Sequence, residues 1–183
     1  MAVLCSGGGT NLQALIDAVE AGTIDGQIVL VLANASKAFA LERAKKHGIP
    51  AEFVSKKQAG SDEAFNDIIL QKLKAADADL VVLAGYLPIL GRQVVRAYEH
   101  RIINIHPSLL PAFRGAHAIE QALEYGVKVF GVTIHYVDGE LDGGRIIAQR
   151  AFPYEGSDIE ELEPMIHAVE YPLYIETIKK LIE

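Results

Sequence analysis

The first half of the chain alternates short β-rich apolar runs with helix-like stretches, and this alternation constrains the fold more than any other feature. Such a pattern is typical of crossover units on a parallel sheet. The expected strands cover residues 2–5, 28–32, 52–54 and 79–84, and helical spacing of apolar residues appears over 12–19, 39–47 and 65–73. The first half therefore predicts an α/β fold with a buried, mostly parallel sheet.

The second half has a different pattern, because its strand-like runs are separated mainly by glycine and acidic turns. These runs cover residues 101–105, 127–137 and 145–152, and they favour an antiparallel extension of the sheet. Ser157-Asp158-Ile159-Glu160 matches a capping box, and apolar residues recur from Ile166 to Ile178. A long C-terminal helix is therefore expected, and the fold class is Rossmann-like α/β with an antiparallel C-terminal extension.

The size and charge of the chain exclude several classes of protein. Its 183 residues favour one domain, 1–183. There are 17 Lys and Arg against 24 Asp and Glu, a formal charge of -7, so a basic nucleic-acid-binding surface is not expected. A single cysteine excludes an internal disulfide, no apolar run is long enough for a membrane span, and no secretory signal pattern is found. We expect a cytoplasmic protein without membrane or nucleic-acid partners.

Ser6-Gly7-Gly8-Gly9-Thr10-Asn11 lies where the first strand passes into a helix. Unpaired N–H groups and the positive end of the helix favour an anion there, and glycine lets the backbone approach a ligand closely. The spacing matches neither the dinucleotide fingerprint nor the P-loop. Two interpretations stay open, a phosphate site and a tight turn that caps the helix.

Asn104 and His106 are two residues apart in the next predicted strand, and Pro107 disfavours helix at His106. Their side chains should therefore share one face. An amide can donate to a developing oxyanion and an imidazole can transfer a proton near neutral pH. Asp142, in a glycine-flanked loop, could orient the imidazole and favour its protonated form. The alternatives are a strand end with two satisfied polar side chains and an acidic turn.

The segment Asn104-Ile105-His106-Pro107-Ser108-Leu109-Leu110-Pro111, with Leu141-Asp142-Gly143-Gly144 downstream, resembles the formyltransferase family that uses 10-formyltetrahydrofolate. The opening segment, residues 6–15, is similar to the branch of that family that acts on glycinamide ribonucleotide, as is His167-Ala168-Val169-Glu170. The resemblance implies the formyltransferase fold and transfer of a formyl group from 10-formyltetrahydrofolate to the amine of glycinamide ribonucleotide in purine biosynthesis. It implies no metal.

The resemblance also implies residue roles. The catalytic residues would be Asn104, His106 and Asp142. The substrate-binding residues would be Gly9, Thr10, Asn11, His167 and Glu170, and the folate-binding residues would be Leu87, Pro88, Ile89, Leu90, Asn104, Asp138, Gly139, Glu140 and Leu141. Residues 1–100 would form the phosphate-binding half and residues 101–183 the catalytic and folate-binding half. We expect direct attack by the amine and two small-molecule partners, glycinamide ribonucleotide and 10-formyltetrahydrofolate. Whether the chain forms a homodimer stays open.

Two positions depart from the family pattern. Pro88 stands where relatives carry an arginine in the folate segment, and Asp62 stands where an arginine helps to hold the phosphate. Proline offers no N–H, so folate contacts there must come from other backbone groups. An acid facing the phosphate weakens that site unless Lys56 or Lys57 compensates.

Three alternative functions stay open. Methionyl-tRNA formyltransferase and formyltetrahydrofolate hydrolase share the core motif, although the first would be expected to carry a further basic domain and the second a further N-terminal domain. The alternative from another class is a non-catalytic phosphate- or nucleotide-binding module that uses only the glycine loop. Turnover that depends on substrate distinguishes this module from an enzyme.

Overall fold

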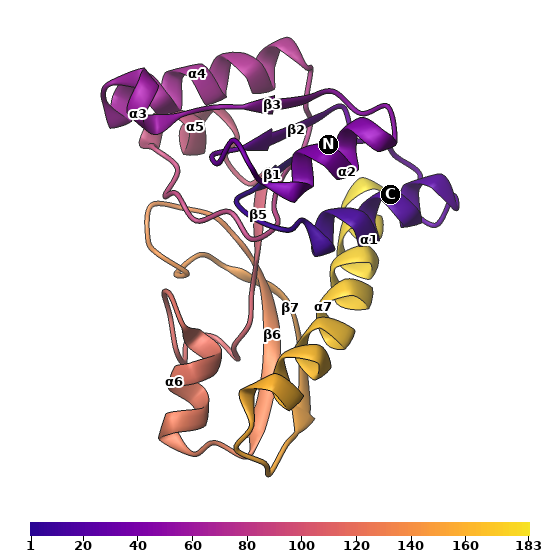
Figure 1. Ribbon diagram of the computed structural model, residues 1–183, viewed down its shortest axis with the longest axis vertical. Helices are drawn as coiled ribbons and strands as arrows, with labels where there is room; N and C mark the ends of the chain where they lie inside the picture. Colours follow the sequence, from indigo (N-terminus) through magenta and orange to yellow (C-terminus); the bar gives the residue numbers. More distant parts are fainter. The chain divides into compact units, whose positions relative to one another are not determined.

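The computed structural model describes residues 1–183 (Figure 1). The chain divides into two units, and the first, Met1–Ile103, is built around short strands, three of which are fully buried. The second unit is Asn104–Glu183. The elements of the first unit are β1 (Ala2–Cys5), α1 (Thr10–Glu20), β2 (Leu30–Ala33), α2 (Phe39–Lys46), β3 (Ala51–Phe53), α3 (Lys56–Ala59), α4 (Asp62–Ala75), β4 (Val81–Leu83) and α5 (Arg92–Ala97). The next strand, β5 (Ile102–His106), crosses the boundary between the units.

The strand order of the first unit is β3-β2-β1-β4-β5. The pairs β1–β2, β1–β4 and β2–β3 are parallel, with Val3 opposite both Val31 and Val82. Every residue of β1, β2 and β4 is buried, as expected where helices cover both faces of a parallel sheet. The helices bury apolar faces that include Leu15 of α1 and Phe65 of α4.

One hydroxyl group joins the loops that follow three of these strands. Ser6 Oγ, just after β1, donates to Asn34 Oδ1 after β2 at 2.6 Å and accepts the N–H of Leu87 after β4 at 2.8 Å. The N–H of Ser6 also donates to Gly85 O at 3.1 Å. Because parallel strands end at the same edge of a sheet, these loops gather at the carboxyl edge, where α/β folds commonly bind ligands.

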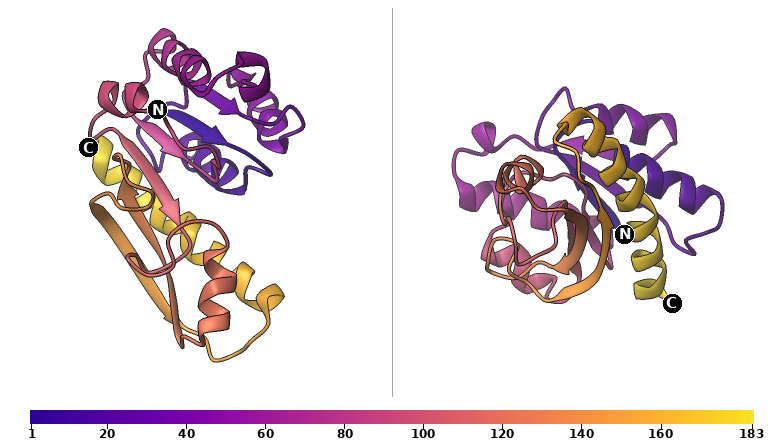
Figure 2. Two further views of the ribbon diagram at one scale, coloured as in Figure 1. Left: turned by 90° about the vertical axis from the view of Figure 1, so that its left-hand side faces the viewer. Right: turned by 90° about the horizontal axis from the view of Figure 1, so that it is seen from below.

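The second unit combines the end of β5 with an antiparallel pair and a long helix (Figure 2). Its elements are α6 (Ala118–Tyr125), β6 (Val129–Tyr136), β7 (Ile146–Pro153) and α7 (Ile159–Ile182), and the strand order is β5-β6-β7. Strands β6 and β7 pair antiparallel, with a bulge between Ile134 and His135. Helix α7 packs along both strands and buries Leu162, Ile166 and Ile178.

The predicted fold class is confirmed, including the antiparallel C-terminal extension. The N-terminal cap of α7 is corrected from Ser157 to Asp158, whose side chain accepts the N–H of Glu160. Three short helices, α3, α5 and α6, were not expected from the sequence. None of the helices is both long enough and apolar enough to cross a membrane.

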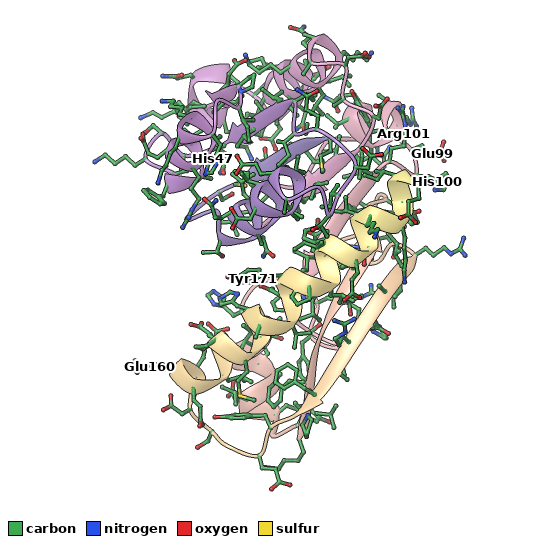
Figure 3. All side chains as sticks on the ribbon, turned by 90° about the vertical axis from the view of Figure 1, so that its right-hand side faces the viewer. His47, Glu99, His100, Arg101, Glu160 and Tyr171 are labelled. Carbon is green, nitrogen blue, oxygen red and sulfur yellow. The ribbon has the colours of Figure 1, made fainter.

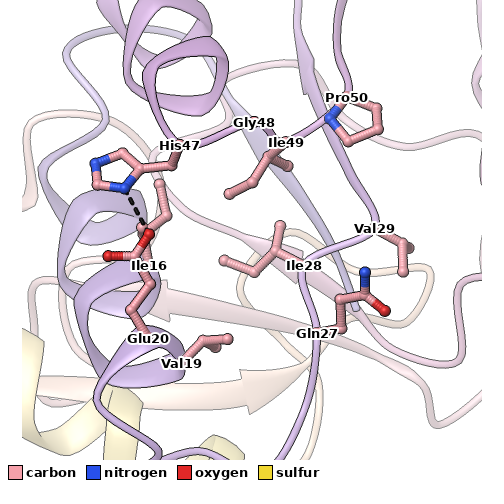
Figure 4. A pocket seen from close by; sticks show the side chains of 10 residues that line it. All are labelled: Ile16, Val19, Glu20, Gln27, Ile28, Val29, His47, Gly48, Ile49 and Pro50. Carbon is pink, nitrogen blue, oxygen red and sulfur yellow. Dashed lines mark hydrogen bonds and ion pairs between the residues drawn. The ribbon is translucent and has the colours of Figure 1, made fainter.

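A cavity of about 300 Å³ lies in the first unit between the end of α1 and the segment that leads from α2 into β3 (Figure 4). Apolar side chains line it, among them Ile16, Ile28 and Ile49. His47 Nδ1 lies 2.6 Å from Glu20 Oε1 at this cavity and joins the C-terminal ends of the two helices. This pair ties α1 to α2 at the end of each helix that lies away from the glycine loop.

Candidate active site

Strand β5 carries Asn104 and His106, both predicted to be catalytic. Alternate residues of a strand project to the same face, so the amide and the imidazole lie on one side of β5. The His106 ring is buried, and its Nε2 donates to the carbonyl oxygen of Phe113 at 2.8 Å. A carbonyl can only accept, so Nε2 carries a proton. The other ring nitrogen, Nδ1, lies 3.5 Å from Asp142 Oδ2.

Asp142 is the third residue of the predicted trio. It contacts the ring of His106 directly, and the ring of His135 lies between it and Asn104. Its Oδ2 accepts the backbone N–H of Gly115 at 2.8 Å, and its Oδ1 lies 3.6 Å from His135 Nε2. The interaction with His135 is the main cause that lowers the pKa of Asp142 to about 2, and the Gly115 N–H and the charges of His106 and His135 contribute further. Burial opposes this shift. Asp142 is therefore a carboxylate at neutral pH.

His135 belongs to the same cluster, although it was not predicted as a site residue. Its Nδ1 donates to the carbonyl of Tyr136 at 2.9 Å, and its Nε2 lies 3.3 Å from Asn104 Nδ2. In the neutral ring Nε2 is unprotonated and accepts a hydrogen from the amide, which fixes which way the amide faces, whereas donation from Nε2 to Asp142 requires the protonated ring. His135 thus contacts both Asn104 and Asp142.

A signal for His135 is present in the sequence. Thr133 and His135 are two polar residues at alternate positions of an otherwise apolar strand, and both are fully buried in β6. Buried polar side chains require partners. Spacing along the chain did not link His135 to His106, because β-sheet pairing brings them together over 29 positions.

The segment that follows His106 is held by a polar anchor beneath it. Thr133 Oγ1 donates to Ser108 O at 2.7 Å and accepts both the N–H of Leu110 at 3.0 Å and Gln149 Nε2 at 2.9 Å. Gln149 Nε2 also contacts Leu110 O at 3.0 Å. These bonds fix the backbone from Ser108 to Leu110, immediately after β5.

The glycines after Asp142 are required by close packing. A Cβ atom on Gly144 would overlap the carbonyl oxygen of Tyr136, and one on Gly143 would lie 2.7 Å from Glu140 Cβ. Asp142 itself has φ 47°, in the left-handed region that disfavours most side chains. The tight turn that these glycines permit brings the carboxylate under the two histidine rings.

The predicted phosphate loop lies in the first unit, between β1 and α1. Gly9 is the N-cap of α1 with φ 71°, and a Cβ there would lie 2.8 Å from Ala40 Cβ. No side chain caps the helix, and its first hydrogen bond runs from the N–H of Gln13 to Gly9 O. Thr10 and Asn11 occupy the first turn of α1, where backbone N–H groups point out of the end of the helix.

The predicted folate segments follow β4 and β6. In the first unit, Leu87 and Ile89 expose 81% and 74% of their surface, whereas Leu90 is buried. In the second unit, Asp138 Oδ1 accepts the N–H of Glu140 at 2.8 Å, and Leu141 is 56% exposed. Leu87 and Ile89 thus place two large exposed apolar side chains on one loop of the first unit.

His167 and Glu170, predicted to bind the ribonucleotide, form a pair on α7. His167 Nδ1 lies 2.8 Å from Glu170 Oε2, and the Tyr171 ring stacks on the His167 ring with centroids 5.8 Å apart. Tyr171 marks this position on the helix in Figure 3. The bond to Glu170 raises the pKa of His167, against the effect of burial. The pair presents a buried carboxylate whose position is set by a half-exposed imidazole.

Asp62 is one of the two positions that depart from the family pattern, and its side chain has a nearby positive partner. Asp62 Oδ1 lies 2.8 Å from Lys56 Nζ, and both side chains are exposed. The acidic charge of Asp62 is therefore balanced locally by Lys56, one of the two lysines that could compensate at the phosphate. Pro88 leaves the folate segment without one N–H donor.

Comparisons with known proteins identify the family. The formyl transferase family matches residues 1–178. The phosphoribosylglycinamide formyltransferase of Bacillus subtilis (strain 168) is 39% identical over 182 residues, 99% of this chain and 93% of that protein. The trifunctional purine biosynthetic protein adenosine-3 of Drosophila pseudoobscura pseudoobscura is 46% identical over 93% of this chain, which spans only 13% of that protein.

A solved structure gives the same result. The crystal structure of phosphoribosylglycinamide formyltransferase from Bacillus halodurans superimposes with a TM-score of 0.96 at 47% identity, covering 100% of this chain and 94% of that one. The resemblance seen in the Asn104–Pro111 and Leu141–Gly144 motifs is thereby confirmed. By sequence and by fold, the chain belongs to the formyl transferase family.

Proposed function

We propose that the chain transfers the formyl group of 10-formyltetrahydrofolate to the amine of glycinamide ribonucleotide, a step of purine biosynthesis. The observation that carries the proposal is the buried cluster in which His106 and His135 contact one ionised carboxylate, Asp142, with Asn104 bonded to His135. A cluster of this kind supplies a donor, a proton carrier and a fixed negative charge, which are the groups that acyl transfer to an amine needs.

The folate is the co-substrate and supplies the formyl group. The exposed apolar side chains of Leu87 and Ile89 suit a flat heterocycle, and the backbone of the same loop can bond its polar edge. The proposed folate residues also include Pro88, Leu90, and the 138–141 loop. Pro88 can contribute only its carbonyl and its ring.

Asn104 is proposed to stabilise the negative charge that develops on the formyl oxygen. Its amide nitrogen carries two hydrogens, one directed to His135 Nε2 and one available to the oxygen. His135 is a positioning residue in this scheme, because its unprotonated Nε2 can only accept, so the amide turns its nitrogen rather than its oxygen toward the ring.

His106 is proposed to be the second donor, in its protonated form. Its Nε2–H is bonded to Phe113 O in this structure, and its Nδ1 faces Asp142. Donation to the formyl oxygen therefore requires Nε2–H to exchange the Phe113 carbonyl for that oxygen. The carboxylate of Asp142, 3.5 Å from Nδ1, fixes the ring during this exchange.

Asp142 is proposed to assist proton movement as well. The attacking amine must lose a proton while the folate nitrogen gains one, and an ionised carboxylate beside an imidazolium can relay it through a water molecule. No covalent bond to the enzyme is needed, since the amine reacts directly with the formyl carbon. The net change is one N–C bond formed and one broken, with one proton moved.

The first unit is proposed to bind the ribonucleotide phosphate at Gly9, Thr10 and Asn11, while His167 and Glu170 contact the rest of that substrate. Replacing Thr10 and Asn11 with alanine removes two side-chain donors from the loop. We expect the KM for glycinamide ribonucleotide to rise far more than the KM for the folate. An equal rise in both would refute the assignment of the loop.

The test of the function offers the purified protein 10-formyltetrahydrofolate with glycinamide ribonucleotide, with methionyl-tRNA, or with water alone, and follows loss of the formyl group from the folate. Turnover only with glycinamide ribonucleotide is expected. Turnover with water alone would favour the hydrolase, and binding without turnover would favour a nucleotide-binding module. The same proposal includes two small-molecule substrates and a cytoplasmic location. It leaves the choice between monomer and homodimer open.

A further inference from the structure

Helix α2 contacts two consecutive carbonyl groups of the glycine loop. The N–H of Ala40 donates to Gly7 O at 3.2 Å, and Nε of Arg43 donates to Gly8 O at 2.7 Å. Gly9 then approaches Ala40 so closely that it has no room for a side chain. The loop is thus held along one side by a helix that contributes none of the predicted substrate-binding residues.

The direction of these carbonyls decides where the neighbouring N–H groups point. The peptide bonds of the loop are trans, because the one cis bond of the chain is Leu110–Pro111. In a planar trans peptide the N–H points opposite to the C=O of the same unit. The N–H groups of Gly8 and Gly9 therefore point away from α2, which exposes them to an anion on the other side.

Arg43 is itself held in place from two further directions. Its guanidinium carbon lies 4.7 Å from the centre of the Phe39 ring, and Nη1 donates to Gln13 Oε1 at 3.2 Å. Gln13 in turn bonds to Asp17 Oδ1 at 2.8 Å on α1. The donor to Gly8 is therefore a fixed group that links the loop, α1 and α2.

We propose that Arg43 is a positioning residue of the phosphate site, acting through the carbonyl of Gly8. By holding that carbonyl toward α2, it keeps the N–H groups of Gly8 and Gly9 directed at the phosphate. This inference rests on the proposed binding of the ribonucleotide phosphate by the glycine loop. It assigns a role to the hydrogen bond from Nε and none to a direct contact between the guanidinium and the phosphate.

Three substitutions separate the hydrogen bond from the charge. Glutamine has an N–H donor, Nε2, the same number of bonds from the backbone as Nε of arginine, but it has no charge. Lysine keeps the charge but has a methylene at that position. Arg43→Ala removes both, and Lys46→Ala is the matched control, since it removes an exposed positive charge from the same helix.

The first measurement uses inorganic phosphate as the probe and records amide NMR signals of Gly8 and Gly9. We expect wild type, Arg43→Gln and Lys46→Ala to respond at similar phosphate concentrations, and Arg43→Ala and Arg43→Lys to require roughly tenfold more, the effect of one lost hydrogen bond. A normal response in Arg43→Lys with a lost response in Arg43→Gln would overturn the proposal in favour of direct charge. Equal responses in all variants would also overturn it.

The second measurement compares kcat/KM for glycinamide ribonucleotide with that for the riboside without its phosphate. Arg43→Ala should lower the value for the ribonucleotide by roughly tenfold and leave the riboside within about twofold. An equal loss for both substrates would show general structural damage and refute the positioning role. If wild type formylates neither, the proposed function fails while the phosphate titration still decides the role of Arg43. If Arg43→Ala does not fold, the comparison of Arg43→Gln with Arg43→Lys decides it.

Discussion

The carboxylate of Asp142 accepts the backbone N–H of Gly115 at 2.8 Å on Oδ2, the oxygen that also lies 3.5 Å from the ring of His106. The last residue of β5 and a residue of the loop that follows it thus converge on one oxygen atom, while Oδ1 faces His135. The charge of Asp142 is stabilised from three sides, and this arrangement makes its titration measurable through protein stability.

The pH dependence of stability should report the low pKa of Asp142. Because the pKa is lowered from 3.8 to about 2 on folding, the ionised group stabilises the native state above pH 4, and this contribution is lost as pH falls toward 2. Its size is about 2 kcal/mol at most. Urea unfolding of wild type and Asp142→Asn should show a difference at pH 5 that shrinks as the pH falls below 4. A difference independent of pH down to 2 would contradict the assignment.

Removing a proposed oxyanion donor should lower turnover strongly. Asn104→Ala and His106→Ala should each reduce kcat by roughly 100- to 1000-fold, with the KM values for both substrates changed little, because the lost interactions strengthen only as negative charge develops. Asp142→Asn should also lose activity. Steady-state kinetics with each substrate varied in turn checks this. A variant with near-normal kcat would be removed from the mechanism.

His135 should act through Asn104, and a double-mutant cycle can show it. His135→Ala should lower kcat by roughly tenfold or more in the wild-type background, because the amide is no longer oriented. In the Asn104→Ala background the same change should cost much less. Equal losses in the two backgrounds would mean that His135 acts independently of Asn104. The control is the unfolding midpoint of Asn104→Ala, which should be unchanged if the variant is correctly folded.

The stabilisation from the His167–Glu170 pair on α7 should depend on pH in the opposite direction. Since the bond to Glu170 raises the pKa of His167, the protonated imidazole stabilises the folded state fully below pH 6.5, and the contribution is lost as pH rises through the folded pKa. The stability difference between wild type and His167→Gln should be largest at pH 5 to 6 and smaller at pH 8. Tyr171→Phe, which keeps the stacked ring, should not alter this profile. A difference that grows with pH would contradict the role of the pair.

The chain order of buried strands and apolar helix faces could be derived from the sequence alone. The run Ala2–Cys5 is a strand over the same residues in the structure, and Phe39–His47 corresponds to α2 to within one residue. These elements were predictable because periodicity and glycine stops are local properties. The short helices α3 and α6 have too few turns to give a periodic signal.

The proposed catalytic residues show where local information ends. Asn104 and His106 could be paired from the sequence, since residues two apart in a strand must share a face. His135 could not be joined to them, because its contact depends on the pairing of strands and on the bulge at Ile134 and His135 that redirects the chain. Side chains far apart in sequence meet only when the sheet is assembled.

The same division holds for the glycine loop. Its composition and its place between a strand and a helix were visible in the sequence and made an anion site one of two open interpretations. The direction of its carbonyls was not, because it is decided by Ala40 and Arg43 on a different helix. Local sequence thus determined which elements form and which residue types stand at their ends. The tertiary structure alone decided which groups those residues face, because hydrogen bonds across the fold depend on distances that only the packed chain defines.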